Sequence, residues 1–131
     1  MTGERNLKVL KALIVDDEPL ARERIRDLLQ RDKAIQIIGE YASGKEASRA
    51  IVSDMPDIVF MDIQIPDLDG FQVLDQIRPH CTPFIIFVTA YKRYIEQKLH
   101  EPSCAYLLKP FDNQRFEFVL TRAKEKIFQN I

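Results

Sequence analysis

Residues 10–19 read LKALIVDDEP, which places a compact apolar run directly before two aspartates and a proline. An apolar run of this length predicts a buried β-strand. Pro19 suits the first turn of a helix, where a backbone N–H is not needed. Four apolar side chains then recur at helical spacing: Ala21, Ile25, Leu28 and Leu29. The segment therefore predicts a strand, an acidic turn and an amphipathic helix.

The rest of the chain repeats this unit. Further strand candidates are 35–39, 58–61, 84–88 and 105–108, and helical patterns cover 43–53, 71–77, 94–100 and 112–127. Five strands alternating with five helices predict an α/β fold: a five-stranded parallel sheet with helices on both faces. The length of 131 residues fits one domain, so we expect a single domain over residues 1–131.

Charge and composition exclude several classes of function. The formal net charge of −1 provides no basic field, so we expect no nucleic-acid binding by this domain itself. We also expect no membrane insertion, because no apolar run approaches the roughly 20 residues that span a bilayer. Met1–Lys8 is polar and does not resemble a signal segment. Cys81 and Cys104 are far apart in the sequence, which predicts two reduced thiols in a cytoplasmic protein.

Polar side chains follow four of the predicted strands. Asp16 and Asp17 follow the first strand, Asp62 the third, Thr89 the fourth and Lys109 the fifth. In open parallel sheets, ligands bind beyond the carboxyl ends of the strands, so these side chains should meet. Three converging carboxylates repel each other unless a cation is present or some are protonated, and Mg²⁺ is the cation that suits carboxylate oxygens and phosphate.

This set of side chains can carry out phosphoryl transfer. A carboxylate can attack phosphorus and form an acyl phosphate, while a metal ion neutralises charge on the transferring group. The ammonium group of Lys109 can pair with phosphoryl oxygens, and the hydroxyl of Thr89 can hydrogen-bond a remaining one.

Four motifs resemble those of response-regulator receiver domains in two-component signalling. They are Leu13–Pro19, the stretch Met61–Pro66 followed by Asp69–Gly70, Val88–Ala90, and Leu108–Pro110. Each is weak alone, but their order on successive strand ends is specific. The resemblance extends from about Lys8 to Ile127 and implies a flavodoxin-like (βα)5 fold.

The resemblance implies a role for each motif residue. Asp62 would be the phosphoacceptor and a metal ligand. Thr89 would be the switch hydroxyl and Lys109 the phosphate-binding amine. Tyr106 would be an aromatic that moves inward in response to the phosphoryl group. For Mg²⁺, Asp17 would be a direct ligand, Asp16 would act through water and Gln64 would offer its backbone carbonyl. The Lys109–Pro110 bond would be cis.

A finer resemblance concerns partners. Ala90-Tyr91 and Tyr106–Asp112 look like receivers of regulators that carry a LytTR-type DNA-binding domain, which would lie outside this chain. The implied partners are a sensor histidine kinase and a second copy of the receiver. The second copy would bind through the fourth helix, fifth strand and fifth helix, and the output of this surface would be control of transcription. The segment Glu101–Cys104 departs from the usual pattern, and Pro102 should shorten the fourth helix or shift its end.

Simpler interpretations stand beside these. Asp16 and Asp17 could be acids at a helix N-terminus, Thr89 a β-branched strand residue, and Lys109 a solvated lysine. Tyr106 could be strand packing, and Phe118, opposite the apolar face of the last helix, could be incidental or part of a partner surface. His80 and His100 lack partners at metal-binding spacing and are expected at the surface.

Three other functions can be weighed from the sequence. A calcium loop around Asp67, Asp69 and Gly70 fails, because that alignment puts Ile65 at its first position. A phosphohydrolase with an aspartyl nucleophile would need an acid two residues after Asp62, where Gln64 stands, so we do not expect a turnover enzyme. A receiver without phosphorylation chemistry is disfavoured because every residue for it is present. Gln64 and Tyr91, which flank the expected path of attacking water, predict slow self-hydrolysis of a phosphoryl group on Asp62.

Overall fold

The computed structural model describes residues 8–97 and 103–129. Their five strands form one sheet of order β2-β1-β3-β4-β5, in which every neighbouring pair is parallel. The strands are β1 (Leu10–Val15), β2 (Ile35–Tyr41), β3 (Ile58–Asp62), β4 (Phe84–Thr89) and β5 (Cys104–Leu108). The five-stranded parallel sheet predicted from the alternating pattern is confirmed.

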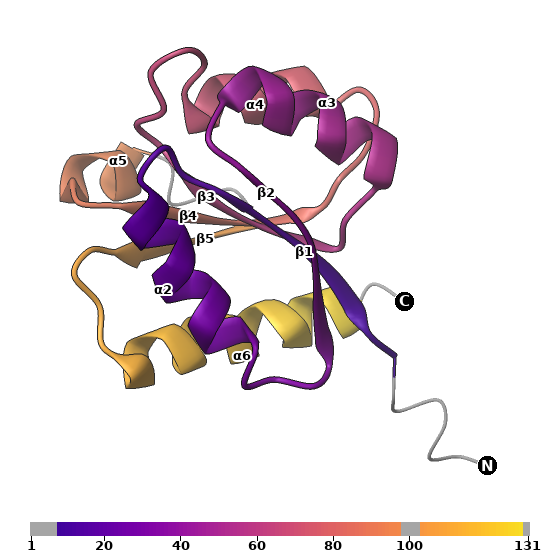
Figure 1. Cartoon of the computed structure of the whole chain (residues 1–131), viewed down its shortest axis with the longest axis vertical. Helices are drawn as coiled ribbons and strands as arrows, with labels where there is room; N and C mark the ends of the chain where they lie inside the picture. The colour runs from indigo at the N-terminus through magenta and orange to yellow at the C-terminus, as the bar shows by residue number, and fades with distance from the viewer. Residues whose placement is uncertain (1–7, 98–102, 130–131) are drawn as a thin grey trace.

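Helices cover both faces of this sheet. α3 (Gly44–Asp54) and α4 (Gly70–Ile77) lie on one face, and α2 (Pro19–Leu29) and α6 (Asn113–Gln129) on the other (Figure 1). α5 (Lys92–Gln97) lies beside the β4 and β5 end of the sheet (Figure 1). The central strands β1, β3 and β4 therefore carry apolar side chains on both faces and read as apolar runs, whereas the edge strands β2 and β5 are only partly buried.

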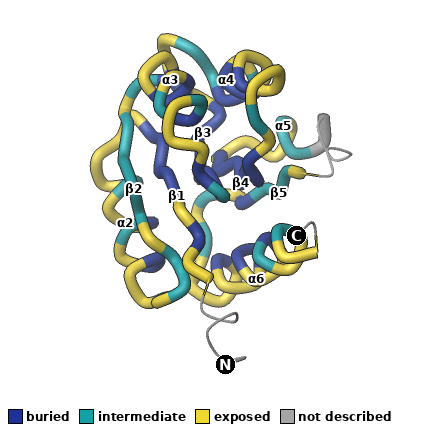
Figure 2. Tube along the Cα trace, turned by 90° about the vertical axis from the view of Figure 1, so that its right-hand side faces the viewer, coloured by how far each residue is buried: buried dark blue, intermediate teal, exposed yellow. Residues whose placement is uncertain are grey.

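Successive residues of β1 enter two separate cores. Ala12 and Ile14 pack with Phe60 and the buried side of α2 and α6. Leu13 and Val15 pack with Ile51 and the buried side of α3 and α4. This alternation follows from the two-residue period of a strand. Figure 2 shows the central strands as the buried part of the molecule, with exposed residues on the outer sides of the helices.

Local signals explain several element boundaries. The Ser43 Oγ accepts the Glu46 amide, as expected of the N-cap of α3. The expected opening of the last helix at Asp112 is off by one residue, because α6 begins at Asn113 and the Asp112 side chain accepts the Arg115 amide from the preceding position. The Lys109–Pro110 bond is cis, as the resemblance implied.

Two expectations fall partly outside the described residues. The fourth helix was expected over 94–100, and α5 begins two residues earlier, at Lys92. The end of that pattern, with His100 and Pro102, lies outside the described residues. Elsewhere, His80 is exposed as expected, and no disulfide joins Cys81 to Cys104. Among the described helices, none is both long and apolar enough to cross a membrane.

Candidate metal centre at the carboxyl end of the sheet

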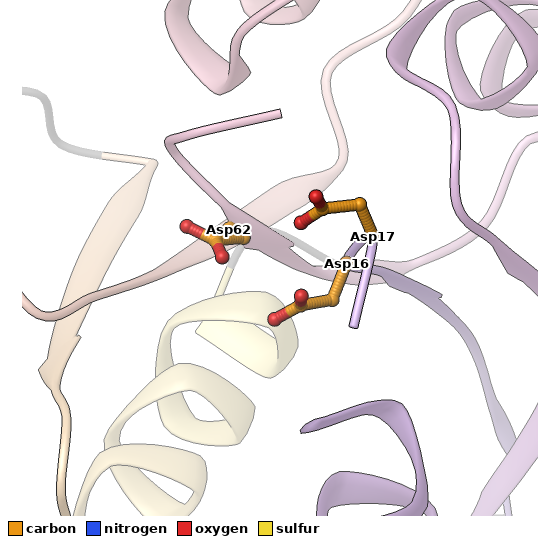
Figure 3. A group of neighbouring side chains, drawn as sticks. All are labelled: Asp16, Asp17 and Asp62. Carbon is orange, nitrogen blue, oxygen red and sulfur yellow. The ribbon is translucent and has the colours of Figure 1, made fainter. Parts of the chain in front are cut away.

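Three carboxylates meet beyond the ends of β1 and β3. Asp16, Asp17 and Asp62 each offer an oxygen, and these oxygens all lie within 4.8 Å of one another. Figure 3 shows the three side chains converging from the two strand ends. Asp16 and Asp62 are buried, with 1% and 9% of their surface exposed, whereas Asp17 is exposed. The convergence predicted for these acids is confirmed, and the pocket opens on the side of Asp17.

Lys109 is the counterion of this pocket. Its Nζ donates to Asp16 Oδ2 at 3.0 Å and to Asp62 Oδ2 at 3.2 Å. Its backbone amide donates to the carbonyl of Thr89 at 2.7 Å, which fixes the segment after β5 against the end of β4. Burial lowers the pKa of Lys109, but its hydrogen bond to Asp16 and the charges of both acids outweigh this effect, so the pKa lies above its usual value. Lys109 therefore stays protonated between the two acids.

One ammonium does not balance three acids. Together, three carboxylates and one lysine carry a formal charge of −2. Burial raises the pKa of Asp62, and the charge of Asp16 adds to this, although the Gln64 amide and Lys109 act in the opposite direction. A divalent cation with a preference for carboxylate oxygens, such as Mg²⁺, fits the residues present, because it would offset the remaining charge.

Gln64 follows Asp62 closely in space as well as in sequence. Its backbone N–H donates to Asp62 Oδ1 at 3.0 Å, so the loop after β3 turns back over the carboxylate. The side chains of Arg93 and Gln64 both hydrogen-bond Tyr94 and hold the pKa of its phenol below the usual value. The Gln64 side chain is exposed, and its contact with Tyr94 links this loop to α5.

Thr89 lies at the end of β4, one residue beyond the residue that pairs with Asp62 in β3. It is fully buried, and its Oγ1 accepts the Tyr91 amide at 3.1 Å. The hydroxyl is therefore held at the same strand edge as the acids. Its role as the switch hydroxyl stays a prediction.

Five aromatic rings form a chain from the pocket to β5. Tyr91 lies 6.1 Å from Tyr94, which lies 6.0 Å from Phe71; Phe71 lies 5.1 Å from Phe87, and Phe87 stacks on Tyr106 at 5.6 Å between ring centroids. Tyr106 is half-buried, so the packing interpretation of this residue is satisfied in the structure. Its inward movement stays a prediction.

Arg22 is a residue of the site that the sequence did not single out. Its guanidinium donates to the backbone carbonyl of Asp16 at 2.6 Å, and it also lies 3.8 Å from Glu40. Arg26 in turn makes two hydrogen bonds to Glu40, at 2.7 and 3.0 Å. The acidic turn after β1 is thereby tied to α2 and β2. One signal could have indicated it, since Arg22 stands one turn into the helix that follows the acids.

A groove of about 690 Å³ lies between α5, β5 and α6. Its apolar lining includes Ile95, Tyr106 and Phe118, and 53% of Phe118 is exposed. Arg115 and Arg122 stand over the Phe118 ring at 5.3 and 5.8 Å. The exposure expected for Phe118 is confirmed, and its ring belongs to the wall of a groove.

The comparison with known sequences gives the family. The family model described as "Response regulator receiver domain" matches residues 12–120. The chain belongs to the response regulator receiver family. Among curated relatives, the transcriptional regulatory protein BtsR of Salmonella typhi is 42% identical over 118 residues, which cover 90% of this chain and 49% of that protein. The sensory transduction protein LytT of Bacillus anthracis is 40% identical over 119 residues, covering 90% and 48%.

Solved receiver structures agree with the fold. The response regulatory domain of MrkE from Klebsiella pneumoniae is 30% identical, with a TM-score of 0.82 over 92% of this chain and 99% of that one. The receiver resemblance is thus confirmed, and the presence of LytT supports the finer likeness to regulators of LytTR type. The chain spans about half the length of the curated relatives it matches. Receivers of this family act in two-component signalling and generally bind Mg²⁺ at an acidic pocket of this kind.

Proposed function

We propose that Asp62 is the phosphoacceptor of this receiver, which takes its phosphoryl group from the phosphohistidine of a sensor kinase. The observation that carries the proposal is the meeting of three carboxylates and Lys109 at one edge of the sheet. Residues that served only to pack the core would not be expected to bury this charge. Asp62 is the member of the set that ends the central strand β3, whereas Asp16 and Asp17 follow the neighbouring strand β1.

The chemistry follows from these positions. A carboxylate oxygen of Asp62 forms a bond to phosphorus while the bond from phosphorus to the donor imidazole breaks, and the electron pair leaves with the imidazole. Lys109 then pairs with a phosphoryl oxygen, and the Thr89 hydroxyl donates to another. Mg²⁺, when bound by Asp17, Asp62, the Gln64 carbonyl and Asp16 through water, would neutralise negative charge on the transferring group.

The phosphoryl group then changes which surface the receiver offers. When Thr89 turns toward the phosphoryl group, it leaves space that Tyr106 can enter from β5. The α5, β5 and α6 groove is the surface next to Tyr106, and we place a homodimer there. The whole chain serves as one receiver domain, and in a longer protein its output would be transcription through a LytTR-type DNA-binding domain.

The test is phosphorylation by a small donor. Acetyl phosphate with Mg²⁺ should add one phosphoryl group, detected by intact-protein mass spectrometry, to the wild type and to the matched control Asp54→Asn, an exposed acid at the end of α3. Asp62→Asn should remain unmodified, as should the wild type in excess EDTA. The proposal fails if the wild type is not modified, or if Asp62→Asn gains the group as fast as the wild type does.

A further inference from the structure

The loop between β3 and α4 is tied to α3 by one carboxylate. Asp67 accepts three hydrogen bonds there: from Ser43 Oγ at 2.7 Å, from the Gly44 amide at 2.9 Å and from the Lys45 amide at 3.1 Å. The bond from Ser43, then those from the two amides, hold the pKa of Asp67 well below its usual range. An acid at this place satisfies amide groups that a helix N-terminus leaves without partners.

Gly44 shows that this contact is a close one. A Cβ atom at Gly44 would overlap the backbone carbonyl of Leu68, the residue after Asp67. The loop backbone therefore rests directly on the first turn of α3, at a position that only glycine leaves open. Because the approach is this close, the position of the loop at Asp67 depends on the position of the first turn of α3.

The same loop begins at the phosphoacceptor. Gln64 N–H bonds the Asp62 carboxylate, and Gly70 N–H bonds the Ile63 carbonyl at 2.8 Å, which closes the loop at its base. Asp69 and Gln72 form a capping box that fixes its other end to α4. Among the described residues, the side-chain hydrogen bonds from this loop to α3 are those of Asp67.

We propose that Asp67 is a positioning residue of the metal site, which sets the path of the loop that carries the backbone carbonyl of Gln64. This inference rests on the proposed function, because it uses the Mg²⁺ site assigned there. It goes beyond that function because it makes the Mg²⁺ affinity depend partly on the hydrogen bonds of Asp67 to the start of α3. By reciprocity, Mg²⁺ bound at the pocket also stabilises the first turn of α3.

The first measurement is Mg²⁺ affinity by calorimetric titration. Asp67→Ala should bind Mg²⁺ about tenfold more weakly, the low end of the effect of groups that orient metal ligands. Asp67→Asn should lie between, since its amide oxygen can still accept the Gly44 amide but its nitrogen cannot accept the Lys45 amide. Glu46→Ala is the matched control, because it removes an acid from the same helix turn without touching the loop, and it should bind like the wild type.

The second measurement separates positioning from general stability. In the wild type, Mg²⁺ should slow hydrogen exchange at the Gly44 and Lys45 amides, and Asp67→Ala should lose this response while circular dichroism shows that it is folded. If Asp67→Ala does not fold, Ser43→Ala, which removes one of the three bonds, takes its place beside Asp67→Asn.

The outcomes separate the two proposals. Failure of the wild type to bind Mg²⁺ at all overturns the proposed function. Wild-type binding with unchanged affinity in folded Asp67→Ala overturns the role of Asp67 and leaves the proposed function standing.

Discussion

On one flank of the acidic pocket, the loops after β1 and β3 are fixed by hydrogen bonds to charged groups, whereas on the other flank α5 and β5 are joined through aromatic rings. The hydrogen-bonded flank uses Arg22 on the Asp16 carbonyl and Asp67 on the start of α3. The ring flank consists of Tyr91, Tyr94, Phe71, Phe87 and Tyr106.

The difference separates two tasks. Charge-assisted hydrogen bonds are directional, so the first flank holds carboxylates in the geometry that a metal ion and a phosphoryl group require. The burial of apolar ring surface is non-directional, and the preferred geometry of a ring pair adds only about 0.5–1.5 kcal/mol, so rings can exchange one packing for another with a small change in free energy. We infer that the hydrogen-bonded flank carries the chemistry and the ring flank carries the response.

The largest expected effect comes from removing Lys109, whose ammonium bonds both Asp16 and Asp62. Lys109→Ala should slow phosphorylation by acetyl phosphate by about 10²–10³-fold, the usual loss when one group that stabilises developing charge is removed. Lys109→Arg should not restore the rate, because a planar guanidinium does not replace a compact ammonium between two carboxylates. The rate is read from intact-protein mass spectra over time. A loss of less than about tenfold for Lys109→Ala would contradict a role of this lysine in the chemistry of the acidic pocket.

The next effect should appear on the ring flank and spare the chemistry. Tyr106→Ala removes the last ring of the chain, so it should be phosphorylated at close to the wild-type rate but lose the response. In the wild type, beryllofluoride with Mg²⁺ should tighten self-association at least about fivefold, as expected of ordinary coupling free energies. Sedimentation velocity measures this in both proteins, and Tyr106→Phe, which keeps the stack on Phe87, is the control.

Either of two results would contradict this division of chemistry and response between the two flanks. If Tyr106→Ala is phosphorylated as poorly as Lys109→Ala, the rings take part in the chemistry. If it still tightens its self-association fully, the response does not pass through Tyr106.

A smaller effect is expected where the two flanks touch. Tyr94→Phe removes the hydroxyl that bonds the Gln64 side chain and leaves the ring in place. Gln64 can then leave the path of attacking water, so phospho-Asp62 should hydrolyse several-fold faster, and Gln64→Ala should do the same. The lifetime is read by mass spectrometry after removal of the donor. An unchanged lifetime in both variants would show that Gln64 does not shield the phosphoryl group.

The acids and the lysine of the site were predictable because a general rule places them. The carboxyl ends of parallel strands share one edge, so Asp16, Asp62 and Lys109 had to meet once the strands were identified. The central strands β1, β3 and β4 were easy to identify because they are buried on both faces and read as apolar runs. The boundaries were less exact, as with the start of α6, because capping decides them residue by residue.

The contacts that hold the site were not predictable from spacing. Arg22 with the Asp16 carbonyl, Asp67 with Ser43, and Tyr94 with Gln64 all join a loop to a helix from another part of the chain. Such contacts depend on the path of the loop and on rotamers, for which no periodic pattern exists. Asp67 illustrates this, since its sequence context suggested only a calcium loop that failed on alignment.

The smallest effect concerns the ion pair behind the hydrogen-bonded flank. The hydrogen bond from Arg26 lowers the pKa of Glu40 below its usual value, burial opposes this, and the charges of Arg26 and Arg22 add to the lowering. A lowered folded-state pKa means that the pair stabilises the fold above the unfolded pKa and that this contribution is lost as the pH falls through the folded value. Glu40→Gln should therefore lower the free energy of unfolding at pH 7, and the loss should stay below about 1 kcal/mol because solvent screens the pair.

The cost should shrink on acidification, and urea denaturation across that range measures it. Glu46→Gln, an exposed acid outside this pair, should show neither the cost nor the pH dependence. Suppose instead that Glu40→Gln lowers the free energy of unfolding by the same amount at acid and neutral pH. Glu40 would then act by packing its stem against α2 and not through its charge. The Asp16 turn would then depend on Arg22 alone.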